Sequence, residues 1–146
     1  MDEQKKYDVC IIGGGLAGLA LSIQLAKLGY AVALFEKEQY PFHKVCGEYI
    51  SLESWNFIEE LGYPLSDMQL PVITQLMVSA PNGNKLEQDL PLGGFGISRF
   101  KLDAGLKDIA LANKVTVFEN CKVTDVAFIN DAFQIQTSNG KFTSRV

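Results

Sequence analysis

The sequence has few of the residues on which several common kinds of functional site depend. It holds one histidine, His43, so a Ser-His-Asp triad could be built only around that residue. Its three cysteines are odd in number and widely spaced, which fits neither a disulfide framework nor a zinc ligand set. We therefore expect a reduced, cytoplasmic protein with no metal site.

Positive charge and long apolar runs are scarce as well. Thirteen basic residues face 17 acidic ones, for a net charge of −4 with no basic stripe, so we expect neither nucleic acid nor an anionic membrane as a direct partner. The most apolar helical stretch, Leu16–Leu28, is interrupted by polar residues, so we expect no transmembrane segment. Residues 1–6 are polar and charged and do not resemble a signal peptide.

The most informative pattern runs from Tyr7 to Lys37. The continuous apolar run Val9–Ile12 predicts a parallel strand that is buried on both faces. A glycine-rich turn follows, and then comes the helical stretch Leu16–Leu28, which we expect Gly29 to end. Ala31–Phe35 predicts a second strand. The segment therefore predicts a β-α-β unit.

Three glycines and one acid give this unit the pattern of a dinucleotide site. Gly13, Gly15 and Gly18 occupy the positions of G-x-G-x-x-G, which permit a tight turn, close approach of a pyrophosphate and close helix–strand packing. Glu36 stands at the tip of the second strand, where a carboxylate can bind a ribose diol. A carboxylate there would repel a 2′-phosphate, so the pattern predicts FAD or NAD and not NADP.

The order of the remaining elements departs from a plain β-α repeat. A long loop precedes a helix at Ser51–Leu61, for which Ser51 is the expected N-cap and Gly62 the expected end. The other expected elements are strands at Val72–Ser79 and Lys85–Asp89 forming a hairpin, flexible backbone at Leu92–Gly96, a helix at Lys101–Asn113, a parallel strand at Val115–Phe118, and a meander of Val123–Ile129, Phe133–Thr137 and Phe142 onward.

Four stretches resemble one family of flavoproteins. They are the glycine turn, Glu36-Lys37, KVCGE at Lys44–Glu48, and ISRFKLDAGL at Ile97–Leu106. With them the chain resembles the N-terminal part of a glutathione-reductase-like FAD-dependent oxidoreductase, in the branch of p-hydroxybenzoate hydroxylase, the flavin halogenases and the geranylgeranyl reductases. The likeness is greatest to geranylgeranyl reductases, whose FAD loop carries a Cys-Gly pair after basic residues. The implied fold is a Rossmann-like three-layer α/β domain that joins a helix-covered parallel sheet to an antiparallel meander.

The resemblance also implies which residues bind the cofactor. The glycine turn would face the pyrophosphate, Glu36 would hold the adenosine ribose, and Cys46 and Gly47 would run toward the flavin. Arg99 would contact the cofactor from the loop ahead of a helix, and Val123 would meet the adenine through its backbone. The full expected set is Gly13, Gly15, Ala17, Gly18, Glu36, Lys37, Cys46, Gly47, Arg99 and Val123.

Taken by themselves, some of these residues have simpler interpretations. Arg99 could pair with a phosphate or be a solvated surface arginine. For Cys46, a packing or backbone role is favoured over redox chemistry, because no second cysteine is nearby in the sequence. Asp103 and Asp108 are most simply read as solvated positions on a helix.

The resemblance finally implies a longer parent protein. Residues 1–146 would be a partial FAD-binding domain, truncated at its C-terminus, in which residues 62–98 form an inserted hairpin segment. The second FAD motif and most of the substrate domain would be absent, so no residue is assigned to catalysis. The 146 residues alone are expected to be inactive and to self-associate.

The parent is expected to be an oxidoreductase that acts on an apolar or aromatic small molecule. Its reaction would be the reduction of isoprenoid double bonds, hydroxylation or halogenation, with NAD(P)H as the candidate electron donor. Two alternatives stay open at this point. One is an NAD-binding dehydrogenase domain, and the other is a non-catalytic nucleotide-binding module that works through a protein partner.

Overall fold

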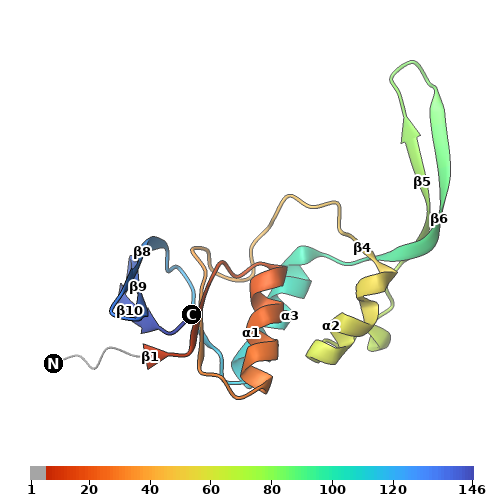
Figure 1. Ribbon diagram of the computed structural model, residues 1–146. Coiled ribbons are helices and arrows are strands. Elements are labelled where there is room, and N and C mark those ends of the chain that lie inside the picture. Colours follow the sequence, from red (N-terminus) through yellow and green to blue (C-terminus); the bar gives the residue numbers. More distant parts are fainter. Residues whose placement is uncertain (1–5) are drawn as a thin grey trace.

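A three-stranded parallel sheet lies at the centre of the computed structural model, which describes residues 6–146 (Figure 1). Its strands run in the order β2 (Val9–Ile12), β3 (Val32–Phe35) and β7 (Thr116–Phe118). Helix α1 (Leu16–Lys27) connects β2 to β3, and α3 (Arg99–Ala112) leads into β7. The predicted β-α-β unit and the third parallel strand are confirmed.

Burial differs between the two predicted apolar strands. Every residue of β3 is buried, as expected of a central strand covered on both faces. The same prediction is wrong for the end of β2, because Ile12 is 55% exposed. On the outer side of β2, the N–H of Cys10 donates to the carbonyl of Val146 at 2.9 Å. Ile12 is the last residue of the strand and lies beyond this contact.

The predicted meander forms a second sheet beside the first (Figure 1). Its strands β8 (Val123–Ile129), β9 (Ala132–Thr137) and β10 (Gly140–Ser144) are antiparallel neighbours. Strand β10 also pairs in parallel with β1 (Lys6–Tyr7). The chain then continues beside β2, where the N–H of Val146 donates to the carbonyl of Asp8 at 3.1 Å.

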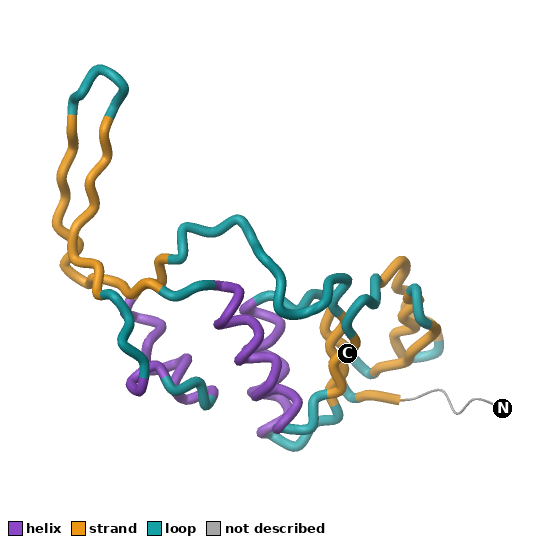
Figure 2. The backbone as a smooth tube through the Cα atoms, turned by 180° about the vertical axis from the view of Figure 1, so that it is seen from behind, coloured by secondary structure: helices purple, strands orange, loops and turns teal. Residues whose placement is uncertain are grey.

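A third sheet carries a long hairpin away from the rest of the molecule (Figures 1 and 2). Its antiparallel strands run in the order β4 (Tyr49–Ser51), β6 (Lys85–Gly96) and β5 (Val72–Ser79). The hairpin prediction is confirmed, but the expectation of flexible backbone at Leu92–Gly96 is wrong. That stretch is the last part of β6. A Cβ at Gly94 would collide with the ring of Tyr49, so this glycine permits close packing of β4 on β6.

The two remaining predicted helices begin differently from expectation. The helix expected from Ser51 begins with a 3₁₀ turn, η1 (Leu52–Ser54), and becomes α-helical only in α2 (Trp55–Leu61). Ser51 does cap the turn, because its hydroxyl accepts from the N–H of Glu53 at 3.4 Å. Gly62 ends α2 in the left-handed conformation, as predicted, and a short turn, η2 (Leu65–Asp67), follows.

Helix α3 begins two residues before the predicted Lys101, which places Arg99 in its first turn. The main core lies where α1 and α3 pack on the parallel sheet. Its fully buried side chains include Leu19, Ile23, Leu34, Leu65, Phe95 and Leu102. In residues 6–146, no helix has both the length and the apolar character that a membrane crossing requires.

Candidate nucleotide-binding site

The turn between β2 and α1 lies at the carboxyl end of the parallel sheet, the usual position of ligands in such folds. Gly13 adopts a φ of 100°, and its N–H donates to the carbonyl of Phe35 at 2.8 Å. A Cβ at Gly18 would collide with the carbonyl oxygen of Gly13. Gly18 therefore has to be glycine for α1 to pack this close to the turn.

The N-terminus of α1 is open. Within residues 6–146, no side chain caps this helix at its N-cap residue, Gly15. The N–H groups of the first helical turn, which includes Ala17, therefore point out of the helix without intrahelical partners. A Cβ at Gly15 would meet one neighbour, Lys44 Nζ, at 3.8 Å, so there is free space directly above this end of the helix. Twelve residues of helix give this end its positive dipole.

Glu36 is bound directly to the glycine turn. One carboxylate oxygen accepts from the N–H of Gly14 at 2.8 Å, and the other accepts from the N–H of Glu38 at 3.0 Å. The side chain is buried, with 6% of the residue exposed. Since a carboxylate offers about four lone-pair sites, two bonds leave acceptor capacity for a further ligand.

Gly14 lies in the candidate site, although the G-x-G-x-x-G pattern does not single it out. A Cβ at this position would collide with the hydroxyl of Tyr40 and would lie 3.0 Å from the Cβ of Glu36. The Tyr40 hydroxyl donates to the carbonyl of Gly14, and the Tyr40 N–H donates to Glu119 at 2.7 Å. Burial, followed by the negative charge of Glu36, raises the pKa of Tyr40, so the phenol stays protonated as a donor.

The loop after β3 forms the outer wall of a hollow beside Glu36. This hollow has a volume of about 570 Å³ and is lined by Glu36, Lys37, Glu38, Phe42, His43 and Lys44. Lys37 is exposed and lies 3.9 Å from the carboxylate of Glu38. His43 stacks on Phe100, and Lys44 lies 4.6 Å above the ring of Phe42. The hollow therefore has acidic, basic and aromatic walls at the strand tip.

Arg99 lies beside this loop as part of an ion-pair network. Its Nε and Nη2 donate to the two carboxylate oxygens of Asp103 at 2.8 and 3.0 Å, one turn later in α3. Lys44 Nζ donates to the same carboxylate at 3.0 Å. The hydrogen bond to Asp103 raises the pKa of Arg99, and the Cys46 thiol beside the guanidinium acts in the same direction.

The prediction that Asp103 is a solvated helix position is wrong, because the residue is only 3% exposed. The available signal was its spacing of four residues from Arg99, which places both side chains on one helix face. The matching prediction for Asp108 is confirmed, with a side chain that is 73% exposed.

The other expected site residues lie at the edges of this region. Cys46 is exposed in the loop before β4, and the N–H of Glu48 contacts its sulfur at 3.4 Å. A Cβ at Gly47 would meet nothing within 4 Å. Val123 opens β8, close to the N–H of Cys121, which donates to the carbonyl of Glu36 at 2.9 Å. The connection from β7 to β8 therefore runs beside Glu36.

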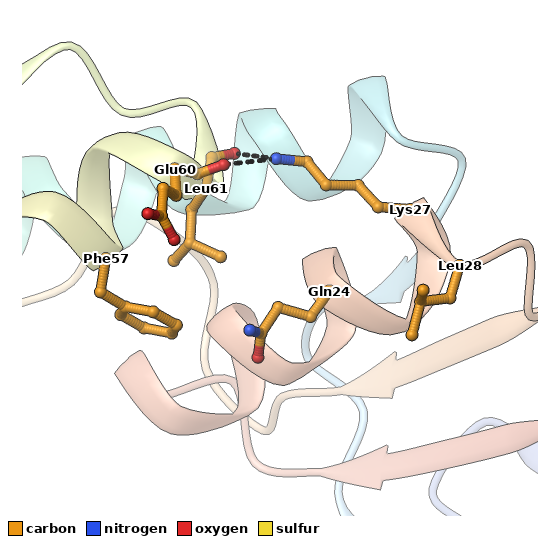
Figure 3. A pocket seen from close by; sticks show the side chains of 6 residues that line it. All are labelled: Gln24, Lys27, Leu28, Phe57, Glu60 and Leu61. Carbon is orange, nitrogen blue, oxygen red and sulfur yellow. Dashed lines mark hydrogen bonds between the residues drawn. The ribbon is translucent and has the colours of Figure 1, made fainter.

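Two further cavities lie against α2. One, of about 410 Å³, begins at Leu16 and Ala17 in the first turn of α1 and is lined mainly by apolar side chains of α1, β4 and α2. The other, of about 270 Å³, is shown in Figure 3. In it Lys27 Nζ donates to the carbonyls of Glu60 at 2.7 Å and Leu61 at 3.1 Å. These bonds tie α1 to the last turn of α2, where the unpaired carbonyls of a helix favour a cation.

Comparison with known proteins identifies the family signature. Residues 8–45 match the family model described as FAD dependent oxidoreductase. Over 141 residues, the chain is 27% identical to digeranylgeranylglycerophospholipid reductase of Sulfolobus acidocaldarius, covering 88% of this chain and 30% of that protein.

Two solved structures show the fold. Halogenase PltM in complex with phloroglucinol and FAD matches with a TM-score of 0.74 and 22% identity, covering 95% of this chain and 33% of that one. The flavin-dependent brominase Bmp2 matches with a TM-score of 0.75 and 25% identity, covering 97% of this chain and 36% of that one. The chain thus spans about a third of the length of these relatives. Residues 8–45 thus match the FAD dependent oxidoreductase model, and the fold of nearly the whole chain is similar to that of two flavin-dependent halogenases.

Proposed function

We propose that this chain is the FAD-binding part of a flavin-dependent oxidoreductase and that its own residues hold the ADP half of the cofactor. The observation that carries the proposal is the hydrogen bond from the Gly14 N–H to Glu36. It joins the open end of α1 to a buried carboxylate with spare acceptor capacity. The carboxyl end of the parallel sheet thereby offers N–H donors for phosphates and a carboxylate acceptor for a ribose.

In this proposal the pyrophosphate lies over Gly13, Gly15 and Gly18, against the open N–H groups at Ala17. Arg99 and Lys44 supply positive charge at the same end of the helix. Arg99 is held by two hydrogen bonds to Asp103, which leave three of its five N–H donors for an anion. Such donors bind phosphate with charge-assisted hydrogen bonds.

The adenosine would occupy the hollow beside Glu36. The carboxylate would accept from the ribose hydroxyls, Lys37 would border the open side, and the backbone of Val123 would meet the adenine. Cys46 and Gly47 would follow the cofactor toward the flavin, since the loop that carries them begins at this hollow. When bound, the flavin supplies the electron transfer, and this chain's residues bind and orient the other half of the cofactor.

The activity of the whole protein is part of the same proposal. The substrate would be an apolar or aromatic small molecule that is reduced, hydroxylated or halogenated, with NAD(P)H as the electron donor. The relative named as a digeranylgeranylglycerophospholipid reductase supports reduction of isoprenoid double bonds, and the structure named as a brominase supports halogenation. The KVCGE stretch at Lys44–Glu48 favours the reductase.

We also infer a cytoplasmic location and no nucleic-acid partner. The three cysteines are free, and the net charge is −4 with no basic stripe. A reducing compartment and a mildly acidic surface are consistent with both inferences.

Calorimetric titration of the 146-residue chain with ADP, FAD and NAD tests the cofactor proposal. We expect ADP to bind at least as well as NAD, and Glu36→Gln to weaken ADP binding about tenfold, the effect of losing about 1.4 kcal/mol of hydrogen bonding to a charged group. Glu87→Gln is the matched control and should leave ADP binding unchanged, because this exposed residue lies on the projecting hairpin, away from Glu36.

Each other outcome favours a different interpretation. Preference for NAD over both ADP and FAD would favour the dehydrogenase domain. A folded chain that binds none of the three at millimolar concentration would contradict the proposal. A longer protein that contains this sequence and retains flavin, but turns over no substrate and binds a partner protein, would favour the non-catalytic module.

A further inference from the structure

One buried carboxylate, Asp103, binds the two cationic side chains of the candidate site. Asp103 is 3% exposed, and three charge-assisted hydrogen bonds reach it from two cations. Arg99 comes from the same helix, and Lys44 comes from the loop after β3, 59 residues earlier in the sequence. A buried carboxylate requires such partners, because an unpaired charge in the protein interior is strongly unfavourable.

Within residues 6–146, both cations keep N–H donors that do not bond to Asp103. Arg99 uses its Nε and one Nη2 hydrogen on Asp103, so both hydrogens of Nη1 remain, with one on Nη2. Lys44 uses one hydrogen on Asp103, and its Nζ lies 3.8 Å from the Cβ position above Gly15. The carboxylate therefore fixes one cation against the open end of α1 and orients the guanidinium beside it.

We propose that Asp103 is a positioning residue for the cofactor pyrophosphate, which acts through Lys44 and Arg99 and does not touch the cofactor itself. This inference rests on the proposed function. Two unpaired cations would repel each other, and their flexible side chains would lose rotamer freedom on binding a phosphate. With Asp103 between them, they are ordered before the ligand arrives, and the three groups together keep one net positive charge for the anion.

Three roles for Asp103 give different results when Asp103→Asn is titrated with ADP. A positioning role predicts weaker binding, by about tenfold. A purely electrostatic role predicts tighter binding, because a negative charge near the phosphates is removed. A purely structural role, in which the network only fastens the loop to α3, predicts a lower melting temperature with unchanged ADP affinity in the folded protein.

Asp108→Asn is the control, since this exposed residue lies on the same helix and should change neither ADP affinity nor melting temperature. A double-mutant cycle with Arg99→Gln adds a readout that a structural role would not move. If Asp103 acts through Arg99, then Asp103→Asn should weaken ADP binding severalfold less in the Arg99→Gln background than in the wild type. Asp103→Glu keeps the charge but displaces both cations, so it should also weaken ADP binding and provides the same test if Asp103→Asn does not fold.

Unchanged or tighter ADP binding by folded Asp103 variants, with the wild type binding ADP, would contradict this inference and leave the proposed function standing. Additive effects of Arg99→Gln and Asp103→Asn would also contradict it. A folded wild-type chain that binds no ADP would contradict the proposed function, and this inference with it.

Discussion

At the scale of single residues, two glycines of the turn have different tasks. A Cβ at Gly18 would meet the backbone oxygen of Gly13, which cannot move without breaking the turn, whereas a Cβ at Gly15 would meet only the end of the flexible Lys44 side chain. We expect Gly18→Ala to lower the free energy of unfolding by about 3 kcal/mol. We expect Gly15→Ala, at the N-cap of α1, to lower the free energy of unfolding by no more than about 1 kcal/mol and to weaken ADP binding, because its methyl group would stand in the proposed pyrophosphate position.

Urea denaturation followed by circular dichroism, together with ADP titration, measures both effects. If both variants lost the same free energy of unfolding, the collision with the Gly13 carbonyl would not be the cause of the loss in Gly18→Ala. Normal ADP binding by Gly15→Ala would place the phosphates elsewhere.

The predictions for single residues were correct where a residue's role depends on its sequence neighbours, and incomplete where it depends on residues far along the chain. The backbone demands on Gly13 and Gly18 follow from a turn of six residues and are visible in the spacing alone. Gly14 was missed because its partner, Tyr40, is 26 residues away. Asp103 was misjudged although its spacing of four residues from Arg99 was a helical signal, and its second partner, Lys44, is 59 residues away and leaves no periodic pattern.

At the scale of elements, one exposed carboxylate joins α2 to the turn that follows it. Glu59 accepts from the N–H of Ser66 at 2.7 Å. Hydrogen bonding from the Ser66 side chain, followed by that from its N–H, lowers the pKa of Glu59. A lowered pKa in the folded state contributes stability above the unfolded value of about 4.3, and this contribution is lost as the pH falls through the lower folded value. Glu59→Gln should therefore lower the melting temperature at pH 7.

The difference between Glu59→Gln and the wild type should shrink as the pH falls from about 4.3 through the lower folded pKa of Glu59, below which both proteins carry an uncharged side chain. Thermal melts between pH 3 and pH 7 would measure it. Glu60→Gln is the control on the same helix, where no side-chain hydrogen bond is formed in the described part of the chain. A difference that grows toward low pH would contradict the argument.

The hairpin of β5 and β6 is a second element whose contribution can be separated. Beyond the bulge between Ile73 and Gln75, its residues are exposed, whereas Phe95 at the base of β6 is fully buried. We expect replacement of residues 76–88 by Asn-Gly to change the free energy of unfolding by less than about 1 kcal/mol, because the removed strands bury little apolar surface.

Gln75 and Asp89 are register partners with side chains 3.0 Å apart, so a two-residue turn can join them. Urea denaturation provides the measurement, and ADP titration confirms that the nucleotide edge is intact. A large loss of stability would show that the hairpin supports the fold beyond its base.

Element boundaries were harder to predict than element types. The strand β6 was expected to end at Asp89 because LGGFG has the composition of a flexible segment, yet these glycines allow β4 to pack closely. Composition does not distinguish a flexible loop from a closely packed strand, since glycine is favoured in both. The start of α3 at Arg99 was also missed, although Ser98, the N-cap residue, is of a type that favours this position.

At the scale of the whole molecule, apolar surface on the projecting hairpin favours association. Leu76, Val78 and Leu86 are each about half exposed or more, and the register places them on one face of the two strands. Ile12 adds exposed apolar surface at the end of β2. We expect the 146-residue chain to increase in mean mass with concentration, to bind FAD weakly and to show no turnover.

Light scattering over a concentration series tests this expectation. The double variant Leu76→Lys with Leu86→Lys should reduce the mean mass, because these residues are not register partners within the hairpin and their charges would repel the same face of a second chain. A clean monomer that binds FAD tightly and stoichiometrically would contradict the expectation and show that these residues are sufficient for the cofactor.

The pairing of the first and last strands has a consequence for the order of folding. Gly13 bonds to Phe35 across a short β-α-β segment, but β1 and β2 pair with β10 and Val146, which almost the whole chain separates from them. Contacts between such distant segments require closure of a long loop and form slowly. Pulsed hydrogen exchange during refolding should therefore show protection of the Gly13 amide before protection of the Cys10 amide. During synthesis on the ribosome, the glycine turn would then form before Val146 pairs with β2.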